Sequence, residues 1–472
     1  MDKVIKLLVT GGIISPGNLE QVAFIAQSHS SDYISIGSRQ ELYISCPEAE
    51  VKVLEKKISK IGFQTEVGQQ QYYNIVTSFA SVGIYPSTTW VTGDTFFDVL
   101  EEFDYYPKLR INITDPQQRL IPIFGCNLNF IASHHLNYWY LYIQLPGSIH
   151  RELWPALIYI DEVAALSKKI EEIYYNHNIT TASELFDKIW NETIKNSRAV
   201  DKELILVKKS IPYYEGMNPV NNSYWLGIYR RDYQYPLNFI LDMCELCNKS
   251  KMGKISLTTW RTILIKDIKE EDRIKWEVLL GKHGINIRHS SLELHWQLPD
   301  MDEEALRLKK HLVKSFDDKD TRTYGLSFSI NTSEIYPFTN VVIKKNEELA
   351  TSFDILYTPD FNPDNDQYLV YKYQIPEEEL SESLKALCLF YYSQLNLHSG
   401  QKEQQSEKKL TLKNYNLFQC KTCFTIYNEE IGDAVNGISA GITFENLPDS
   451  YTCPICEGSK IDYVSIETNV AL

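Results

Sequence analysis

Two pairs of closely spaced cysteines near the C-terminal end constrain this 472-residue chain more than any other feature. Cys420 and Cys423 form the first pair, Cys453 and Cys456 form the second, and 29 residues separate the pairs. Each Cys-x-x-Cys turn can present two thiolates to one ion, and four thiolates close a tetrahedral site. This geometry suits zinc and a single iron equally well, so the spacing predicts a metal site without naming the metal. A framework of disulfides is the weaker interpretation, because the chain has nine cysteines and an odd number cannot all be paired.

The sequence between the two pairs resembles that of rubredoxins. Residues 431–438 read IGDAVNGI, and residues 441–456 read GITFENLPDSYTCPIC. The resemblance implies a rubredoxin domain over residues 415–472, in which the four cysteines hold one iron that cycles between the ferric and ferrous states. In a domain this small the metal should supply much of the free energy of folding. We expect a small aromatic core beneath the metal, built from Phe418, Tyr427, Phe444, Tyr451 and Tyr463.

Two features of this domain bear on its properties. Rubredoxins usually carry glycine directly after the second cysteine of each pair, whereas this chain has Phe424 and Glu457 there and Gly458 one position later. Bulkier residues can change the N–H···S hydrogen bonds and hence the reduction potential. Residues 415–472 also carry eight acidic and two basic side chains, a net charge of −6. An acidic surface around the metal would steer the domain toward a basic redox partner.

The composition of the whole chain excludes several functional classes. The net charge is −15 and no cluster of basic residues occurs, so we expect no nucleic-acid partner. No window of 18 apolar residues is present, so we expect no membrane span, and without a secretory signal we expect a cytoplasmic protein. The polar stretch GQKEQQSEKKLTLK at residues 400–413 predicts a solvated linker over 399–414.

The first 400 residues contain two copies of one pattern of helix, strand, strand and helix. In the first copy, Asn18 is the expected N-cap of the opening helix, and the strands lie within ISIGSRQELYI at residues 34–44. The second copy contains ISLTTWRTILI at residues 255–265, with the same length and the same apolar positions. A duplicated unit, repeated after roughly 220 residues, is the simplest interpretation.

The duplicated pattern resembles the ferredoxin-like half domains of the sulfite/nitrite reductase family. Ser38-Arg39-Gln40 is similar to the T-R-Q segment of first halves, and Thr259-Trp260-Arg261 is similar to the T-x-W-R segment of second halves. The resemblance implies an α+β multidomain fold with two pseudo-symmetric halves, followed by the small rubredoxin-like metal-bound β module. The expected divisions are a half domain and an α/β domain in each half, at residues 1–70, 71–205, 206–300 and 301–398.

The cofactors of that family are expected to be largely missing here. Its working members hold a [4Fe–4S] cluster through two pairs of cysteines, and one thiolate bridges to siroheme. Residues 74–86 and 108–118, where the pairs should lie, contain no cysteine, and Cys126 alone cannot replace them. We therefore expect no [4Fe–4S] cluster.

Siroheme is disfavoured but stays open as a ligand of the scaffold. Four basic residues lie in the segments where the family binds siroheme carboxylates and its anionic substrate, and guanidinium groups bind such anions well. Siroheme has more carboxylates than these residues would satisfy, and for each of them an ordinary salt bridge is the alternative. The four candidates are Arg39, Lys108, Arg110 and Arg261.

The remaining cysteines and a histidine pair give weaker signals. Cys244 and Cys247 have helical spacing, which favours core packing over metal binding. His134 and His135 are adjacent, and neighbouring side chains of a helix or strand point apart, which argues against a shared metal. Three cysteines are interpreted as inert apolar residues, namely Cys46, Cys126 and Cys388.

Together these features predict an electron carrier rather than a complete oxidoreductase. The rubredoxin domain would accept and pass single electrons, and the cluster-less scaffold would dock it onto a redox partner, such as a reductase or a flavoprotein. Two alternatives stay open. In the first, the scaffold binds siroheme or another tetrapyrrole and the rubredoxin domain is its built-in donor. In the second, zinc occupies the four-cysteine site and only stabilises the C-terminal domain, and the protein acts in non-redox interactions.

Overall fold

The fold comprises two compact units, one formed by Met1–Asp302 and one that begins at Glu303. None of the helices in the described part of the chain is both long enough and apolar enough to cross a membrane. The computed structural model describes residues 2–118, 120–148, 150–177, 179–189, 196–206, 211–331, 339–346, 351–365, 367–402, 417–423, 425–429, 432–433, 436–439 and 441–466.

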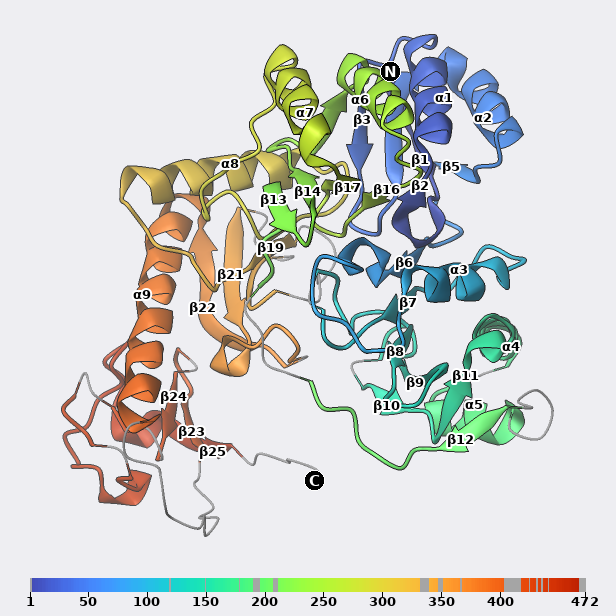
Figure 1. Ribbon diagram of the computed structural model, residues 1–472. Helices are drawn as coiled ribbons and strands as arrows, with labels where there is room; N and C mark the ends of the chain where they lie inside the picture. Colours follow the sequence, from blue (N-terminus) through green and yellow to red (C-terminus); the bar gives the residue numbers. More distant parts are fainter. Residues whose placement is uncertain are drawn as a thin grey trace. The chain divides into compact units, whose positions relative to one another are not determined.

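The first unit contains the two predicted half domains, and in both of them the order helix, strand, strand, helix is confirmed (Figure 1). The first half domain consists of β1 (Asp2–Leu7), α1 (Pro16–Gln27), β3 (Tyr33–Ile36), β4 (Leu42–Pro47), α2 (Val51–Lys60) and β5 (Thr65–Val67). The second consists of β13 (Gly216–Val220), β14 (Ser223–Ile228), α6 (Leu237–Lys249), β16 (Ile255–Leu257), β17 (Ile263–Ile268) and α7 (Glu270–Lys282).

The two half domains exchange one short strand each. β2 (Ile13–Ile14) comes directly before α1 in the chain but pairs with β16 of the second half domain. β15 (Gln234–Pro236) comes directly before α6 but pairs with β3 of the first half domain. The strand orders are therefore β15-β3-β4-β1-β5 and β13-β14-β17-β16-β2. Each half domain thus completes the sheet of the other at an equivalent edge.

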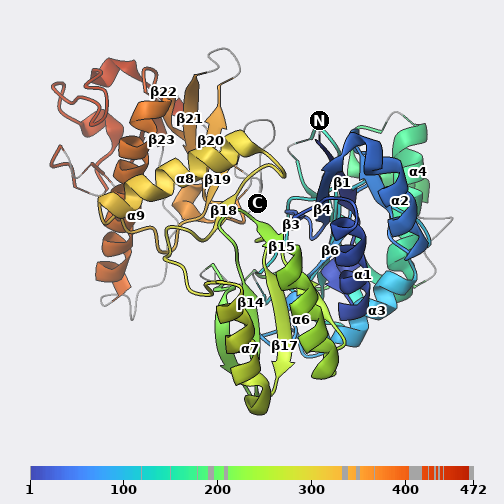
Figure 2. The ribbon, with the colours of Figure 1, turned by 90° about the horizontal axis from the view of Figure 1, so that it is seen from above.

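The exchange gives the half domains one common hydrophobic core. Along β4, Leu42, Ile44 and Cys46 point inward, as the alternation of a half-buried strand requires. The same core includes Phe239 and Met243 of α6, and α1 and α6 pack side by side (Figures 1 and 2). The hydrophobic effect therefore holds the two copies together as one body.

The N-cap of α1 differs from the prediction. Asn18 lies inside the helix, and its backbone N–H donates to the Oγ of Ser15 at 3.1 Å. Ser15 is the N-cap and Pro16 is the first helical residue, where the missing N–H of proline costs no hydrogen bond. Ser15-Pro16 was the stronger signal in the sequence.

A larger mixed sheet follows the first half domain. β6, β7 and β8 run parallel, and β8, β9, β11 and β12 are successively antiparallel. Aromatic residues, which favour the β conformation, make up most of β9. The strands are β6 (Ile75–Thr77), β7 (Ile111–Thr114), β8 (Leu128–Ala132), β9 (Tyr138–Ile143), β10 (Glu152–Leu153, beside β9), β11 (Ala156–Tyr159) and β12 (Ser197–Ala199). The helices are α3 (Gly93–Glu101), α4 (Val163–Asn176) and α5 (Ala182–Ile189).

The second unit begins after the two-residue strand β18 (Trp296–Gln297). Its first part contains α8 (Glu303–Asp318), β19 (Phe328–Asn331), β20 (Val341–Lys345), β21 (Ser352–Tyr357), β22 (Leu369–Pro376) and α9 (Glu377–Lys402). Its last part is a three-stranded sheet of order β24-β23-β25, from β23 (Leu417–Cys420), β24 (Ile426–Asn428) and β25 (Tyr463–Ile466). The predicted linker over 399–414 begins inside α9, and its residues 403–414 lie outside the described ranges. The other predicted domain boundaries stay predictions.

Phe239 tests whether the two half domains share one core. We expect Phe239→Ala to lower the free energy of unfolding by about 3–5 kcal/mol, because a fully buried ring leaves a cavity. Amide hydrogen exchange measured by mass spectrometry should accelerate in β3 and β4 as much as in β16 and β17. Ile274→Ala on the exposed face of α7 is the matched control. Acceleration confined to β16 and β17 would show two separate cores.

Candidate metal centre

Four cysteine sulfur atoms converge in the C-terminal domain. Cys420 is the last residue of β23 and Cys423 lies in the turn that follows, while Cys453 and Cys456 lie between two short 3-10 helices, Phe444–Asn446 and Lys460–Asp462. All four Sγ atoms lie within 4.8 Å of one another. The Sγ atoms of Cys420 and Cys456 are 3.6 Å apart, and those of Cys423 and Cys453 are 3.3 Å apart. Metal–sulfur bonds of about 2.3 Å in a tetrahedron separate the sulfurs by about 3.8 Å, so one ion fits this set.

The surroundings of Cys453 favour the thiolate form of its sulfur. Burial raises the pKa of Cys453, but the neighbouring polar groups, first the Tyr463 side chain and then the backbone N–H groups of Cys456 and Ile455, outweigh it and lower the pKa to about 6. Burial raises the pKa of Cys423 to about 12. The turn of the second pair therefore supplies the N–H···S bonds that stabilise negative charge on sulfur.

Glu457, which stands where the resemblance to rubredoxins leads us to expect glycine, has a positive φ angle. Its φ angle is 59°, in the left-handed region. Gly458 then comes close to the metal site, because a Cβ at this position would lie 3.3 Å from the Sγ of Cys456. Its N–H also donates to that sulfur. A residue with a Cβ is strained in the left-handed conformation, so Glu457 makes this turn less stable than glycine would. Phe424, the other departure, lies outside the described residues.

The aromatic core predicted beneath the metal is confirmed. Tyr427, Tyr451 and Tyr463 are buried together with Cys420 and Cys453. The rings of Phe418 and Phe444 stack with centroids 4.2 Å apart and pack against this cluster.

The acidic residues of the domain are less uniformly exposed than its net charge indicates. Asp433 is buried and accepts a hydrogen bond from the Tyr451 hydroxyl at 2.8 Å. Glu429 is buried and accepts from the N–H of Phe444 at 2.9 Å. These two carboxylates serve the fold, and among the described residues of the domain the exposed acidic side chains are Glu445, Asp449 and Glu457.

In the scaffold, Arg261 is engaged in an internal ion pair. It lies in the turn between β16 and β17, and its side chain is only 2% exposed. Its Nε and Nη2 donate to Oδ1 of Asp300 at 3.2 and 2.8 Å, and Nη2 also donates to the carbonyl of Leu298. Its guanidinium lies 4.8 Å from the ring centroid of Tyr233. A carboxylate of the chain itself therefore occupies the place of an external anion on this arginine.

Asp300 also joins the two matching turns of the half domains. It accepts hydrogen bonds from the N–H and the hydroxyl of Ser38 at 2.9 and 2.8 Å. Burial, and secondly the charge of Asp300, raise the pKa of the nearby Glu41 to about 7. The carboxylate of Asp300, with a partial charge on Glu41, makes this region less electropositive than the sequence alone indicates.

The other three basic candidates have separate surroundings. The Nη2 of Arg39 donates to the carbonyls of Asn74 and Ile111 at 2.6 and 3.1 Å, and its Nη1 lies 2.9 Å from the Sγ of Cys126. Lys108 is exposed, with its Nζ 5.8 Å from the ring centroid of Tyr175. Arg110 lies over the ring of Tyr73, at 5.7 Å. Each of the four basic candidates thus contacts different groups of the protein.

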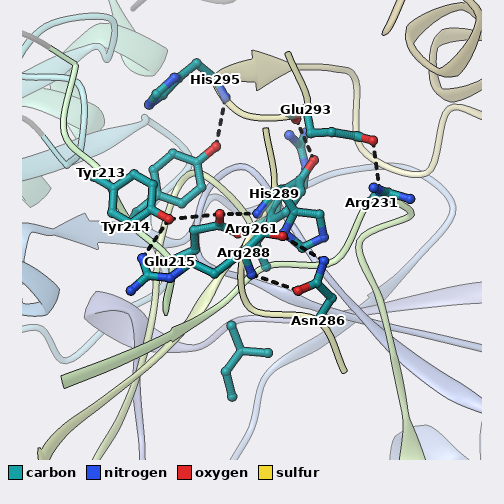
Figure 3. A network of polar contacts seen from close by, with 12 residues as sticks. Tyr213, Tyr214, Glu215, Arg231, Arg261, Asn286, Arg288, His289, Glu293 and His295 are labelled. Carbon is teal, nitrogen blue, oxygen red and sulfur yellow. Dashed lines mark hydrogen bonds and ion pairs between the residues drawn. The ribbon is translucent and has the colours of Figure 1, made fainter. Parts of the chain in front are cut away.

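A buried polar network lies close to Arg261, and the sequence analysis did not identify it (Figure 3). Glu215 is fully buried and accepts from the N–H of His289 and from the Tyr213 hydroxyl at 2.6 and 3.1 Å, while its other oxygen lies 2.6 Å from Nδ1 of that histidine. Tyr214 stacks on Trp260 with ring centroids 5.4 Å apart. The partners are up to 74 residues apart, so no local pattern could reveal them.

The remaining cysteines do not replace the missing cluster ligands. Cys244 and Cys247 are fully buried in the common core of the half domains, and burial raises the pKa of both. Cys126 is buried, and its Sγ lies 2.9 Å from Oδ1 of Asn112. Residues 74–86 form β6, a short 3-10 helix (Ser78–Ser81) and the segment after it, without a thiol. The residues present therefore do not fit a [4Fe–4S] cluster.

Glu457→Gly should stabilise the C-terminal domain. Glycine adopts the left-handed conformation without the penalty of a Cβ, so we expect a gain of about 1 kcal/mol in the free energy of unfolding. Glu457→Ala removes the carboxylate but keeps the Cβ, and it should show no such gain. Urea unfolding of the metal-loaded chain, followed through the absorption of the metal site, measures both. Equal stability of the two variants would refute the strain at this position.

Asp300→Ala should destabilise the first unit by about 3–5 kcal/mol, because it leaves the buried guanidinium of Arg261 without its counter-charge. Glu245→Ala removes an exposed ion pair with Lys249 and should change stability by less than about 0.5 kcal/mol. Thermal unfolding of both variants makes the comparison. A small effect of Asp300→Ala would mean that the pair contributes little.

Comparison with known proteins agrees with this geometry. The sequence model of the family described as Rubredoxin matches residues 417–463. Over 49 residues the chain is 45% identical to Rubredoxin-2 of Chlorobaculum tepidum, which covers 10% of this chain and 94% of that protein. It is 44% identical over 50 residues to the rubredoxin of Acinetobacter baylyi, covering 11% and 93%. It is 44% identical over 55 residues to Rubredoxin-2 of Ectopseudomonas oleovorans, covering 12% of this chain and 32% of that longer protein.

The scaffold has its own structural relative. The NirA protein of Mycobacterium tuberculosis superimposes with a TM-score of 0.63 over 81% of this chain and 80% of that chain, at 12% identity. A likeness at this identity concerns the fold alone, and it confirms the reductase-like fold predicted from the duplicated half domains. Through its C-terminal domain the chain belongs to the rubredoxin family, and most of the remaining chain has the fold of NirA.

Proposed function

We propose that this protein transfers single electrons through an iron held by Cys420, Cys423, Cys453 and Cys456. The observation that carries the proposal is the convergence of these four sulfurs within 4.8 Å in a domain of the rubredoxin family. When bound, the iron supplies a ferric/ferrous couple. Four protein ligands leave no open position for a substrate, so the site is suited to electron transfer rather than to Lewis-acid catalysis.

The side chains around the site support electron exchange with a protein partner. Cys423 and Cys456 are partly exposed, whereas Cys420 and Cys453 are buried. Ile455, between the cysteines of the second pair, is 52% exposed and gives an apolar contact surface beside the metal. The exposed carboxylates of the domain add negative charge. We infer a partner with a basic docking face, approached from the side of Cys423 and Cys456.

The scaffold serves for docking in this proposal, and it binds neither siroheme nor a [4Fe–4S] cluster. The cysteines needed for the cluster are missing, and Asp300 neutralises Arg261. Arg39 donates to backbone carbonyls, which leaves fewer of its N–H groups for an anion. The partner class that we propose is a reductase or a flavoprotein. We further place the protein in the cytoplasm, where a reducing environment keeps buried thiols such as Cys46 and Cys388 unpaired.

Cys453→Ser tests the electron-transfer proposal. We expect this variant to lose its iron or its rubredoxin-type spectrum. With it should go the one-electron reduction of cytochrome c, a basic protein acceptor, by protein that has first been reduced with dithionite and freed of the excess. Cys46→Ala, a buried thiol of the scaffold, is the control and should keep both properties. Iron content and stopped-flow absorption measure the two effects. Unchanged cytochrome c reduction by Cys453→Ser would refute the proposed route.

The salt dependence of the same reaction tests the docking face. The rate should fall as ionic strength rises, because exposed charges are screened beyond a Debye length of about 8–10 Å. The double variant Glu445→Gln and Asp449→Asn should weaken this dependence. Glu245→Gln and Glu277→Gln in the scaffold remove equal charge elsewhere and should not. Equal effects of the two double variants would place the docking face outside the rubredoxin domain.

A further inference from the structure

A second group of metal-binding side chains lies in the first unit, far in the sequence from the four cysteines. His134 and His135 occupy the turn between β8 and β9, and Asp201 follows β12. The sequence analysis argued against a shared metal because neighbouring side chains of a helix or strand point apart. The two histidines lie in neither, and the structure turns both rings toward the same carboxylate.

Three ligand atoms meet at this place. The Nε2 of His134 lies 3.4 Å from Oδ1 of Asp201, and the Nε2 of His135 lies 3.0 Å from both carboxylate oxygens. The two ring centroids are 3.9 Å apart. Ligand bonds of about 2.0–2.2 Å in a tetrahedral zinc site separate neighbouring ligand atoms by about 3.4 Å. One ion can therefore bind all three groups after small movements of exposed side chains.

The backbone holds the three residues in place. The N–H of His135 donates to the Oγ of Ser133 at 3.1 Å, and the N–H of Tyr138 donates to the carbonyl of His135 at 3.1 Å, which fixes the turn. On the other side, the Tyr140 hydroxyl donates to the carbonyl of Lys202 at 2.8 Å. This bond anchors the residue next to Asp201 on the strand β9, which begins directly after the turn.

The chemistry of the group favours a cation. One carboxylate can accept from both Nε2 atoms only when each ring carries its proton there. In the other neutral tautomer both nitrogen lone pairs point at a negative carboxylate, and a divalent ion removes that repulsion. Two imidazoles and a carboxylate are ligands that zinc and similar transition metals prefer. The side chains of His134, His135 and Asp201 are 33%, 18% and 45% exposed, so an ion can enter from solvent.

We propose that His134, His135 and Asp201 form a binding site for one divalent ion of the zinc class, separate from the iron site and independent of the electron-transfer proposal. Three protein ligands leave a position for water. The bound ion joins the β8–β9 turn to the chain after β12. In that position it clamps the last described segment of the first half, residues 196–206, onto the mixed sheet, where Val200 and Leu204 already pack against Tyr140 and Leu157.

Zinc binding to the full-length, iron-loaded protein tests this site. Loading with one iron per chain first fills the four-cysteine site, and the iron content is checked again after the experiment. Equilibrium dialysis against buffered micromolar Zn²⁺, with metal analysis, should then give one zinc per chain. Asp201→Asn and His135→Ala should each weaken binding at least about tenfold, since loss of an outer-shell partner alone costs that much.

His150→Ala is the matched control, because it removes an exposed histidine from another loop of the same unit. It should bind zinc like the unaltered protein. Zinc should also raise the midpoint of thermal unfolding of the unaltered and His150→Ala proteins, and leave that of Asp201→Asn unchanged. Far-UV circular dichroism shows whether each variant is folded. Absence of stoichiometric zinc in the unaltered protein, or equal affinity of Asp201→Asn, would overturn the proposal.

Discussion

The mutual repulsion of four thiolates is the constraint on which the C-terminal domain depends. Four sulfurs within 4.8 Å of one another cannot all carry negative charge unless a cation lies between them. The aromatic cluster beneath them is small, so it cannot by itself hold the two cysteine turns against that repulsion. We therefore expect metal binding and folding of this domain to be coupled. The polar groups around Cys453 and the close approach of Gly458 favour negative charge on the sulfurs.

The scaffold shows how two similar half domains are joined into one body. The exchange of β2 and β15 and the common core stabilise the half domains. Arg261 is used internally, paired with Asp300, which also ties down the matching turn of the first half. The same ion pair thus links the two pseudo-symmetric turns and lowers the positive potential between them.

Local patterns in the sequence predicted the features that are determined by residues close together along the chain. The order of helices and strands in both half domains follows from apolar periodicity, and the four cysteines follow from their spacing. The five aromatic residues of the small domain were predicted from its resemblance to rubredoxins. The sequence did not reveal contacts between distant segments. Asp201 lies 66 residues from His135, and Glu215 lies 74 residues from His289, so neither pairing leaves a local signal. Glu429 and Asp433 were counted as surface charge, although both are buried by partners that only the fold brings together.

The central claim is that the protein carries electrons on a rubredoxin iron and that its scaffold holds no tetrapyrrole. The absorption spectrum of the full-length protein, purified from iron-sufficient cells that make siroheme and recorded before and after dithionite, tests both parts together. The account predicts thiolate-to-iron(III) charge-transfer bands that bleach on reduction, with one iron per chain and no Soret-type band. A Soret-type band that copurifies with the protein would contradict the account of the scaffold, and a colourless protein with zinc in the four-cysteine site would contradict the electron-transfer function.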